Sequence, residues 1–132
     1  AFISNYSNMF EELTLKENFT YYFNIFNKKF DENYNFYLEK FNLNKFENMK
    51  INIFSLGMKQ KANIMLNLCI DYKIYIFDEP FSGLDIESQN YLFEIINKLA
   101  NENKMVFLVS HHIERLDNGK NYLLENKIIT EI

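Results

Sequence analysis

The first half of the chain has the apolar spacing of amphipathic helices. Hydrophobic side chains recur every three or four positions after Thr14, after Asp31 and after Ser55, which places them on one helical face. Each of these residues can cap a helix N-terminus with its side-chain oxygen, and Thr14 and Glu17 have the spacing of a capping box. The pattern predicts three helices, from about 15 to 28, from Asp31 to about Phe41, and from Ser55 through Ile70.

The second half contains compact apolar runs that predict strands. Ile74–Phe77 and Met105–Val109 are short, continuous hydrophobic stretches, which are typical of buried parallel strands. A helix opened by Asp85 is predicted between them. Its apolar face is formed by Ile86, Leu92, Phe93, Ile95, Ile96 and Leu99. This order predicts a β-α-β unit with a right-handed crossover.

The last residues predict a hairpin, because Tyr122–Leu124 and Lys127–Ile132 are apolar stretches separated by Glu125-Asn126. The predicted fold class is therefore α/β, with a helical subdomain followed by a parallel β-α-β core and a C-terminal hairpin. Ligands of open parallel sheets bind outside the carboxyl ends of the strands. We expect the functional residues at those ends.

Composition adds constraints on the class of protein. The 132 residues fit one small domain or a piece of a larger one, and 48% hydrophobic content is enough for a packed core. Because the sequence starts at Ala1, we expect a cut or missing start. No apolar stretch approaches the roughly 18 residues that a membrane span needs, so we expect the chain itself to be soluble.

Charge and cysteine content exclude some functions. A formal net charge of -4 and a pI near 5.2 argue against a nucleic-acid surface, which needs clustered Lys and Arg. Lys59 and Lys61 are the only pair of basic residues that suggests a nucleic-acid contact, and they belong to another motif. The single cysteine, Cys69, lies among apolar residues, so we expect a buried hydrophobe and no catalytic or metal-bound thiol.

Asp78 and Glu79 directly follow the first predicted strand. An isolated acid pair of this kind is usually a solvated strand end or a helix cap. Here Pro80, the only proline of the chain, disfavours the helical conformation at Glu79 and helps to direct its carboxylate outward. A metal-bound phosphate could then lie beside the pair.

Ser55-Leu56-Gly57-Met58 opens the third predicted helix. A hydroxyl, a glycine whose backbone can be approached closely, and a helix N-terminus together make an anion site. The alternative is an ordinary serine cap on a core-facing helix, and the four residues alone do not decide between the two.

Two further polar motifs follow. Ser82-Gly83-Leu84-Asp85 precedes the helix between the strands and reads as a turn with a helix cap. Ser110-His111 follows the second strand. A lone histidine is usually structural or solvated, and the adjacent His112 leaves the choice of residue open.

In this order, these motifs resemble the ATP-hydrolysing subunits of ABC transporters. Asp78-Glu79-Pro80 after an apolar run is similar to the Walker B segment, and Ser55 to Met58 is similar to the signature motif in its export-type form. Ser82 to Asp85 matches the D-loop, and Ser110-His111 matches the switch-histidine loop, with His111 preferred over His112 because of the residues that follow.

The resemblance implies the role of each residue. Asp78 would hold Mg²⁺, Glu79 would polarise the attacking water, and His111 would contact the γ-phosphate of ATP. The signature residues Ser55, Leu56, Gly57 and Met58 would touch the γ-phosphate held by the opposite subunit. Asp85, in the D-loop, would link the sites of the two subunits.

The N-terminal stretch extends the resemblance. Met9–Thr14 with Glu17 and Asn18 is similar to the segment that follows the Q-loop and faces the membrane subunit. Asn5 then stands where the family has Gln or Glu, near magnesium or water, with a side chain one methylene shorter than Gln. The segment Asn5 to Ser55 is too short for the coiled coils of the chromosome-organising relatives.

The phosphate-binding motif Gly-x-x-x-x-Gly-Lys-Ser/Thr does not occur in these 132 residues, which contain three glycines. We expect 1–132 to be a partial ABC ATPase domain. Its expected parts are a stretch from about 6 to 71, with the Q-loop exit, helical subdomain and signature helix, and a core from about 72 to 132.

The function implied is ATP binding and hydrolysis coupled to export across a membrane. The expected partners are a transmembrane permease subunit and a second ATP-binding subunit, in a homo- or heterodimer at the cytoplasmic face. We expect the chain to be inactive alone. The alternatives are a ribosome-acting, non-transport ABC protein and a degenerate, non-catalytic interaction module. The presence of Glu79 and His111 argues against a degenerate protein, whereas Asn5 and the missing phosphate-binding motif argue for one.

Overall fold

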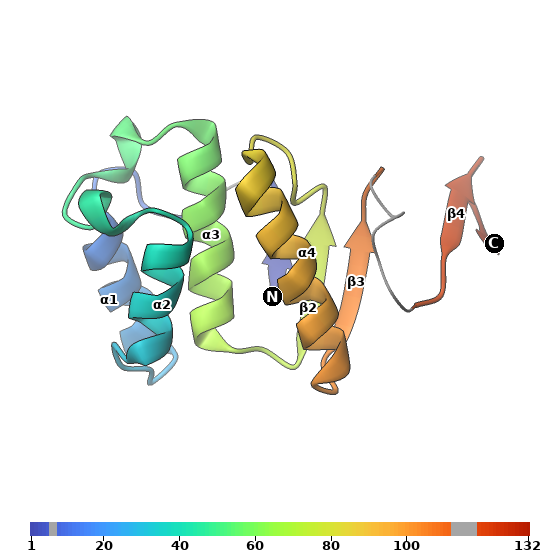
Figure 1. Ribbon diagram of the computed structural model, residues 1–132, viewed down its shortest axis with the longest axis horizontal. Helices are drawn as coiled ribbons and strands as arrows, with labels where there is room; N and C mark the ends of the chain where they lie inside the picture. The colour runs from blue at the N-terminus through green and yellow to red at the C-terminus, as the bar shows by residue number, and fades with distance from the viewer. Residues whose placement is uncertain (6–7, 112–118) are drawn as a thin grey trace.

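A computed structural model describes residues 1–5, 8–111 and 119–132 of the chain. In these residues a parallel sheet of three strands has the order β1 (Phe2–Ile3), β2 (Ile74–Asp78) and β3 (Met105–Val109). Helices α1 and α2 lie to one side of the molecule, and α4 lies in front of β2 and β3 (Figure 1). The predicted α/β class and the parallel β-α-β unit are confirmed.

The four main helices begin where the sequence predicts. They are α1 (Leu15–Ile25), α2 (Glu32–Lys40), α3 (Leu56–Ile70) and α4 (Ile86–Asn101), and two short 3₁₀ turns, Asn44–Phe46 and Ile51–Ile53, precede α3. Each N-terminus has the expected cap, because the side chains of Thr14, Asp31, Ser55 and Asp85 accept a backbone hydrogen bond from the first helical turn. Helix α1 ends three residues earlier than predicted, and Asn27 beyond it has a left-handed φ of 52°.

Strand β1 was not predicted. Its two residues, paired with Ile76 and Phe77, are too few to show a periodic pattern. The N-terminus extends the ladder, since the amino group of Ala1 donates to the carbonyl of Ile74 at 2.6 Å and the amide of Ile76 donates to the carbonyl of Ala1 at 2.9 Å.

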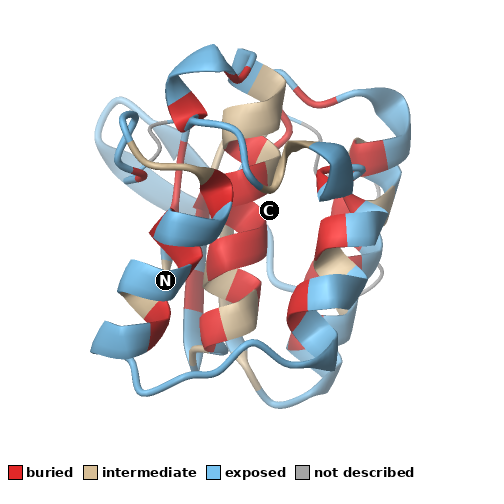
Figure 2. Ribbon diagram, turned by 90° about the vertical axis from the view of Figure 1, so that its left-hand side faces the viewer, coloured by how far each residue is buried: buried red, intermediate tan, exposed pale blue. Residues whose placement is uncertain are grey.

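Helices α3 and α4 pack against one face of the sheet. Tyr75 and Phe77 of β2 point into this core and are fully buried, as is Ile3 of β1. Helix α3 is buried along much of its length between the helical layer and the sheet (Figure 2).

The opposite face of the sheet is exposed, which corrects the prediction of buried strands. Its large apolar side chains are Phe2, Ile74, Ile76, Met105, Phe107 and Val109. The continuous apolar runs predicted cover on both faces, but within residues 1–5, 8–111 and 119–132 only one face carries packed helices. The strands therefore alternate between exposed and more buried positions.

An aromatic cluster holds α1 against α2. Phe19, Phe23, Phe30 and Tyr34 meet edge to face or tilted, with ring centroids 4.6 to 6.2 Å apart. The hydroxyl of Tyr34 donates to Glu47 at 2.9 Å. The aromatic residues here serve packing.

The C-terminal hairpin is confirmed as β4 (Tyr122–Glu125) paired antiparallel with β5 (Ile128–Glu131). The turn is one residue later than predicted, because Asn126 and Lys127 both have a left-handed φ and form the tight connection that hairpins favour. In the described part of the chain, none of the helices has the length and apolar character to cross a bilayer.

The cap of α1 predicts a stability difference. The amide of Thr14 donates to Glu17 at 2.8 Å, and the amide of Glu17 donates to the hydroxyl of Thr14 at 3.1 Å. We expect Thr14→Ala to lower the free energy of unfolding by about 1 kcal/mol in urea titrations. Thr20→Ala, on the exposed side of the same helix, is the control and should not lower it, because alanine favours a helix interior more than threonine does. Equal losses in the two variants would contradict the capping box.

Candidate functional site

The carboxyl ends of β2 and β3 bring two predicted residues together. Asp78 pairs in register with Val109, and the amide of Glu79 continues the ladder by donating to the carbonyl of Val109 at 2.9 Å. Two residues beyond Val109, Nε2 of His111 lies 3.4 Å from Oε1 of Glu79. The parallel register therefore places Asp78, Glu79 and His111 at one edge of the sheet.

These three side chains differ in exposure. The His111 side chain is 92% exposed, whereas Asp78 and Glu79 both have intermediate burial at the strand end, the Glu79 side chain being 34% exposed. The edge thus combines two partly buried carboxylates with an imidazole that a ligand can reach. His112 lies outside the described residues.

Glu79 has a strained backbone. Its φ is 46°, in the left-handed region that costs an L-residue about 1–2 kcal/mol. The residue does leave the right-handed helical region, as expected before Pro80. Strain of this kind concentrates at functional sites, and here it turns the chain out of β2 so that the Glu79 carboxylate reaches His111.

Asn5 leaves the sheet at the same edge. Ile3 pairs with Phe77, so the chain exits β1 beside the end of β2, and Asn5 is exposed there. The carbonyl of the preceding Ser4 accepts a hydrogen bond from Asn63 of α3 at 3.5 Å.

The start of α3 lies at the same end of the molecule as the finish of β2 and β3 (Figure 1). The hydroxyl of Ser55 accepts a hydrogen bond from the amide of Met58 at 3.2 Å, so the serine is a helix cap. Ser55 and Leu56 are exposed, whereas Met58 packs against the core. Capping and ligand binding at an exposed helix N-terminus are compatible.

Gly57 makes a close approach inside the chain. A Cβ atom at this position would lie 2.3 Å from the carbonyl oxygen of Gly83, closer than such atoms can pack. Gly83 itself has a φ of 76°. The absence of a side chain at Gly57 is therefore required for packing against the 82–85 turn.

Asp85 has two partners. Its carboxylate caps α4 by accepting from the amide of Ser88 at 2.9 Å, and it lies 2.5 Å from Nζ of Lys61 on α3. The hydrogen bond from Lys61, followed by that from Ser88, lowers the pKa of Asp85 to about 2. Sequence reasoning missed Lys61, because residues 61 and 85 are far apart in the chain and no local pattern relates them.

A metal at the sheet edge would depend on few protein ligands. Residues 1–5, 8–111 and 119–132 contain no group of three or more His, Cys, Asp or Glu side chains that could hold an ion. Mg²⁺ commonly binds through one or two carboxylates together with waters and substrate phosphates. The single carboxylate of Asp78 fits that mode.

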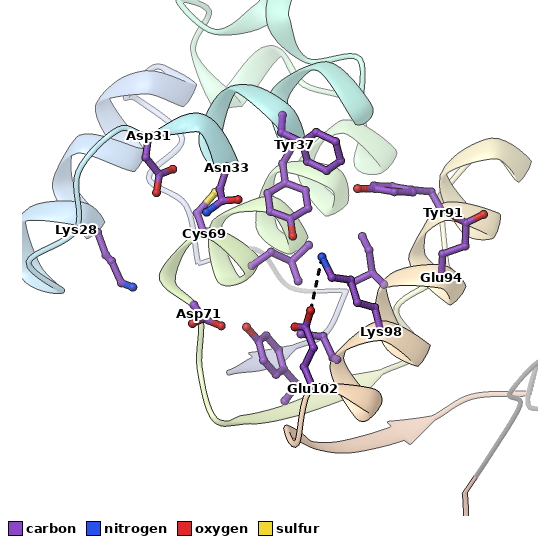
Figure 3. Close-up of a pocket in the computed structure, with 15 residues that line it drawn as sticks. Lys28, Asp31, Asn33, Tyr37, Cys69, Asp71, Tyr91, Glu94, Lys98 and Glu102 are labelled. Carbon is purple, nitrogen blue, oxygen red and sulfur yellow. Dashed lines mark ion pairs between the residues drawn. The ribbon is translucent and has the colours of Figure 1, made fainter.

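A separate cleft of about 400 Å³ lies between α2 and α4 (Figure 3). Cys69, Tyr37 and Tyr91 are part of its lining, and Lys98 and Glu102 form an ion pair at 3.7 Å on its rim. None of the predicted site residues lines it. Burial raises the pKa of the Cys69 thiol to about 12, which agrees with a packing role, although Cys69 is only half-buried.

The left-handed φ of Glu79 predicts an unusual order of stabilities. We expect Glu79→Gly to have a free energy of unfolding about 1 kcal/mol above that of Glu79→Ala, because only glycine adopts this φ without a steric penalty. At Glu94, within α4, the order should be the opposite: Glu94→Ala should have a free energy of unfolding about 1 kcal/mol above that of Glu94→Gly. Urea denaturation of the four variants measures both differences. Alanine being the more stable residue at both positions would contradict the strain.

Comparison with known proteins adds independent information. A model of the ABC transporter family matches residues 1–82, more than half of the chain. The ABC transporter ATP-binding protein NatA of Bacillus subtilis is 42% identical over 67 residues, which are 51% of this chain and 27% of the relative. The lantibiotic transport ATP-binding protein SrtF of Streptococcus pyogenes is 38% identical over 81 residues, 59% of this chain and 35% of the relative.

Solved structures have the same fold. An ATP-binding subunit of an ABC transporter superposes with a TM-score of 0.72 and 28% identity, over 85% of this chain and 49% of the other. A dimeric ATP-binding cassette in a post-hydrolysis state, bound to ADP and Pi, gives a TM-score of 0.69 at 23% identity, over 86% of this chain and 53% of the other.

The chain spans about a quarter to a third of the length of these curated relatives. Within the matched stretches its sequence is 42% and 38% identical to theirs. The match over residues 1–82 shows that this chain belongs to the ABC transporter family of ATP-binding domains.

Proposed function

We propose that this chain contributes one half of an ATP-hydrolysing site. The observation that carries the proposal is the sheet edge, where the register of β2 with β3 gathers Asp78, Glu79 and His111 and leaves Nε2 of His111 3.4 Å from Oε1 of Glu79. Phosphoryl transfer asks a protein mainly to position groups and to place charge, and this edge offers both.

Each residue has a distinct task in the proposal. Asp78 holds Mg²⁺, which neutralises charge on the phosphates of ATP. The Glu79 carboxylate accepts a hydrogen bond from the attacking water and draws its proton. His111, exposed beside Glu79, donates a hydrogen bond to the γ-phosphate as its charge develops. Asn5, at the same edge, would help to hold Mg²⁺, directly or through a water.

The other half of the site comes from a second copy or a related subunit in this proposal. The exposed N-terminus of α3, with Ser55 and Gly57, contacts the γ-phosphate bound by the partner through its amides and dipole. Leu56 is 62% exposed at this tip and would be covered in the dimer. Asp85 and its turn lie beside the same contact.

The wider role that we propose is transport. The relatives include a lantibiotic transport ATP-binding protein and the energy-coupling factor transporter ATP-binding protein EcfA1 of Thermotoga maritima, 41% identical over 61 residues. By analogy this chain couples ATP hydrolysis to export through a transmembrane permease, at the cytoplasmic face of a membrane. In this proposal the stretch Met9–Thr14 faces the permease, and the part from about 72 to 132 holds the hydrolytic edge.

The test uses two proteins. The first is the 132-residue chain, which contains no phosphate-binding loop motif and should show no ATPase turnover above background. The second, here called the loop-completed protein, joins residues 1–132 to the N-terminal half of an ATP-binding family member that carries the loop. It should hydrolyse ATP in a magnesium-dependent manner.

Replacing the proposed base should remove this activity. In the loop-completed protein we expect Glu79→Gln to lower kcat by at least about 100-fold, because a positioned general base contributes that much or more. Glu94→Gln, on the exposed face of α4, makes the same chemical change and should leave kcat unchanged. An undiminished rate in Glu79→Gln would remove Glu79 from the mechanism.

A further inference from the structure

The first two turns of α3 are joined to the 80–85 loop by three contacts. Gly57 packs against the carbonyl of Gly83 so closely that a Cβ could not fit. The side-chain amide of Gln60 donates to the carbonyl of Pro80 at 3.2 Å in the buried interior. Nζ of Lys61 lies 2.5 Å from Oδ2 of Asp85. We call these three pairs the helix–loop contact.

The ion pair is the polar element of this contact that a substitution can remove without disturbing the backbone. The Lys61 side chain is only 12% exposed, whereas that of Asp85 is 55% exposed, so the ammonium is largely covered while the carboxylate faces water. A charge-assisted hydrogen bond that is partly shielded from solvent is stronger than a fully exposed ion pair. Asp85 stays ionised at neutral pH, since Lys61 and then Ser88 hold its pKa near 2.

The neighbouring lysine offers a built-in comparison. Lys59, one turn from Ser55, forms an ion pair with Glu11 in the loop that precedes α1. The two lysines thus fix the same stretch of α3 to different segments, Lys59 to the N-terminal loop and Lys61 to the loop after β2. Of these two lysines, Lys61 is the one that pairs with the 80–85 loop.

We propose that Lys61 is a positioning residue that holds the 82–85 turn against the start of α3, so that the signature residues and the D-loop move as one body. The functional consequence rests on the proposed function, which places both elements at the contact with a partner subunit. Two elements that must meet one partner together gain accuracy when their relative position is held before the partner arrives.

The physical claim is tested by hydrogen exchange of backbone amides in the 132-residue chain, without nucleotide. The reporters are the amides of Ser82 and Leu84, which donate to Glu79 and Phe81 within the turn. Lys61→Met should speed their exchange about tenfold, the effect of losing a hydrogen bond to a charged group. Exchange of the β3 amides should stay unchanged.

Three further single variants and one double variant make the result specific. Lys59→Met removes the same charge from the same helix and should leave the exchange of Ser82 and Leu84 as in the unmodified chain. Lys61→Arg should restore protection. Asp85→Asn keeps a helix cap but loses the charge, so it should match Lys61→Met, and the double variant should show no further increase. Unchanged exchange in Lys61→Met, or equal increases in Lys59→Met, or additive effects in the double variant would overturn the proposal.

The catalytic consequence is measured separately in the loop-completed protein. Lys61→Met should lower kcat about tenfold or more while KM for ATP stays the same, and Lys61→Arg should recover kcat. A loss that appears only in KM would contradict a positioning role. If the loop-completed protein does not hydrolyse ATP at all, the proposed function fails, and the exchange experiment still decides whether Lys61 holds the turn.

Discussion

The parallel pairing of β2 with β3 is the constraint on which the candidate site depends. Two strands that run in the same direction finish at the same edge, and the register that pairs Asp78 with Val109 determines which residues leave the sheet side by side. A slip of one residue would exchange the buried and exposed faces of the strand. It would also separate Glu79 from His111. The buried side chains of Tyr75 and Phe77 therefore hold the register that the polar edge requires.

A second constraint lies immediately after β2. The chain must turn sharply out of the strand at Glu79, and it does so with a left-handed φ of 46° followed by Pro80. The loop then returns to the start of α3, where Gly57 admits the carbonyl of Gly83. The packing of α3 against the sheet and the shape of this loop are thus coupled, because a shift of α3 or of the loop would break the contact between Gly57 and Gly83.

Local signals explain what the sequence could predict. Caps depend on residues within one helical turn, and Thr14, Asp31, Ser55 and Asp85 all cap helices as expected. The two longer strands and α4 carry periodic or continuous apolar patterns that a short window detects. The position of polar residues directly after each strand was then enough to place them at one edge.

The features that the sequence did not reveal are non-local. Strand β1 has two residues and exists only because β2 offers it an edge. The continuous apolar runs of β2 and β3 gave no sign that one face would be exposed. The pair Lys61–Asp85 joins segments that meet because α3 packs against the loop after β2. The left-handed φ of Glu79 likewise has no local sequence pattern that predicts it.

The sheet edge with Asp78, Glu79 and His111 and the exposed start of α3 lie at one end of the molecule, and in the function proposed above two such subunits enclose ATP between them. The most direct measurement is an experimental structure of the loop-completed protein carrying Glu79→Gln, with ATP and Mg²⁺. We expect Mg²⁺ bound to Asp78, and the γ-phosphate between His111 of one subunit and the backbone at Ser55 and Gly57 of the other. A γ-phosphate bound away from the sheet edge, with Asp78 free of metal, would contradict it.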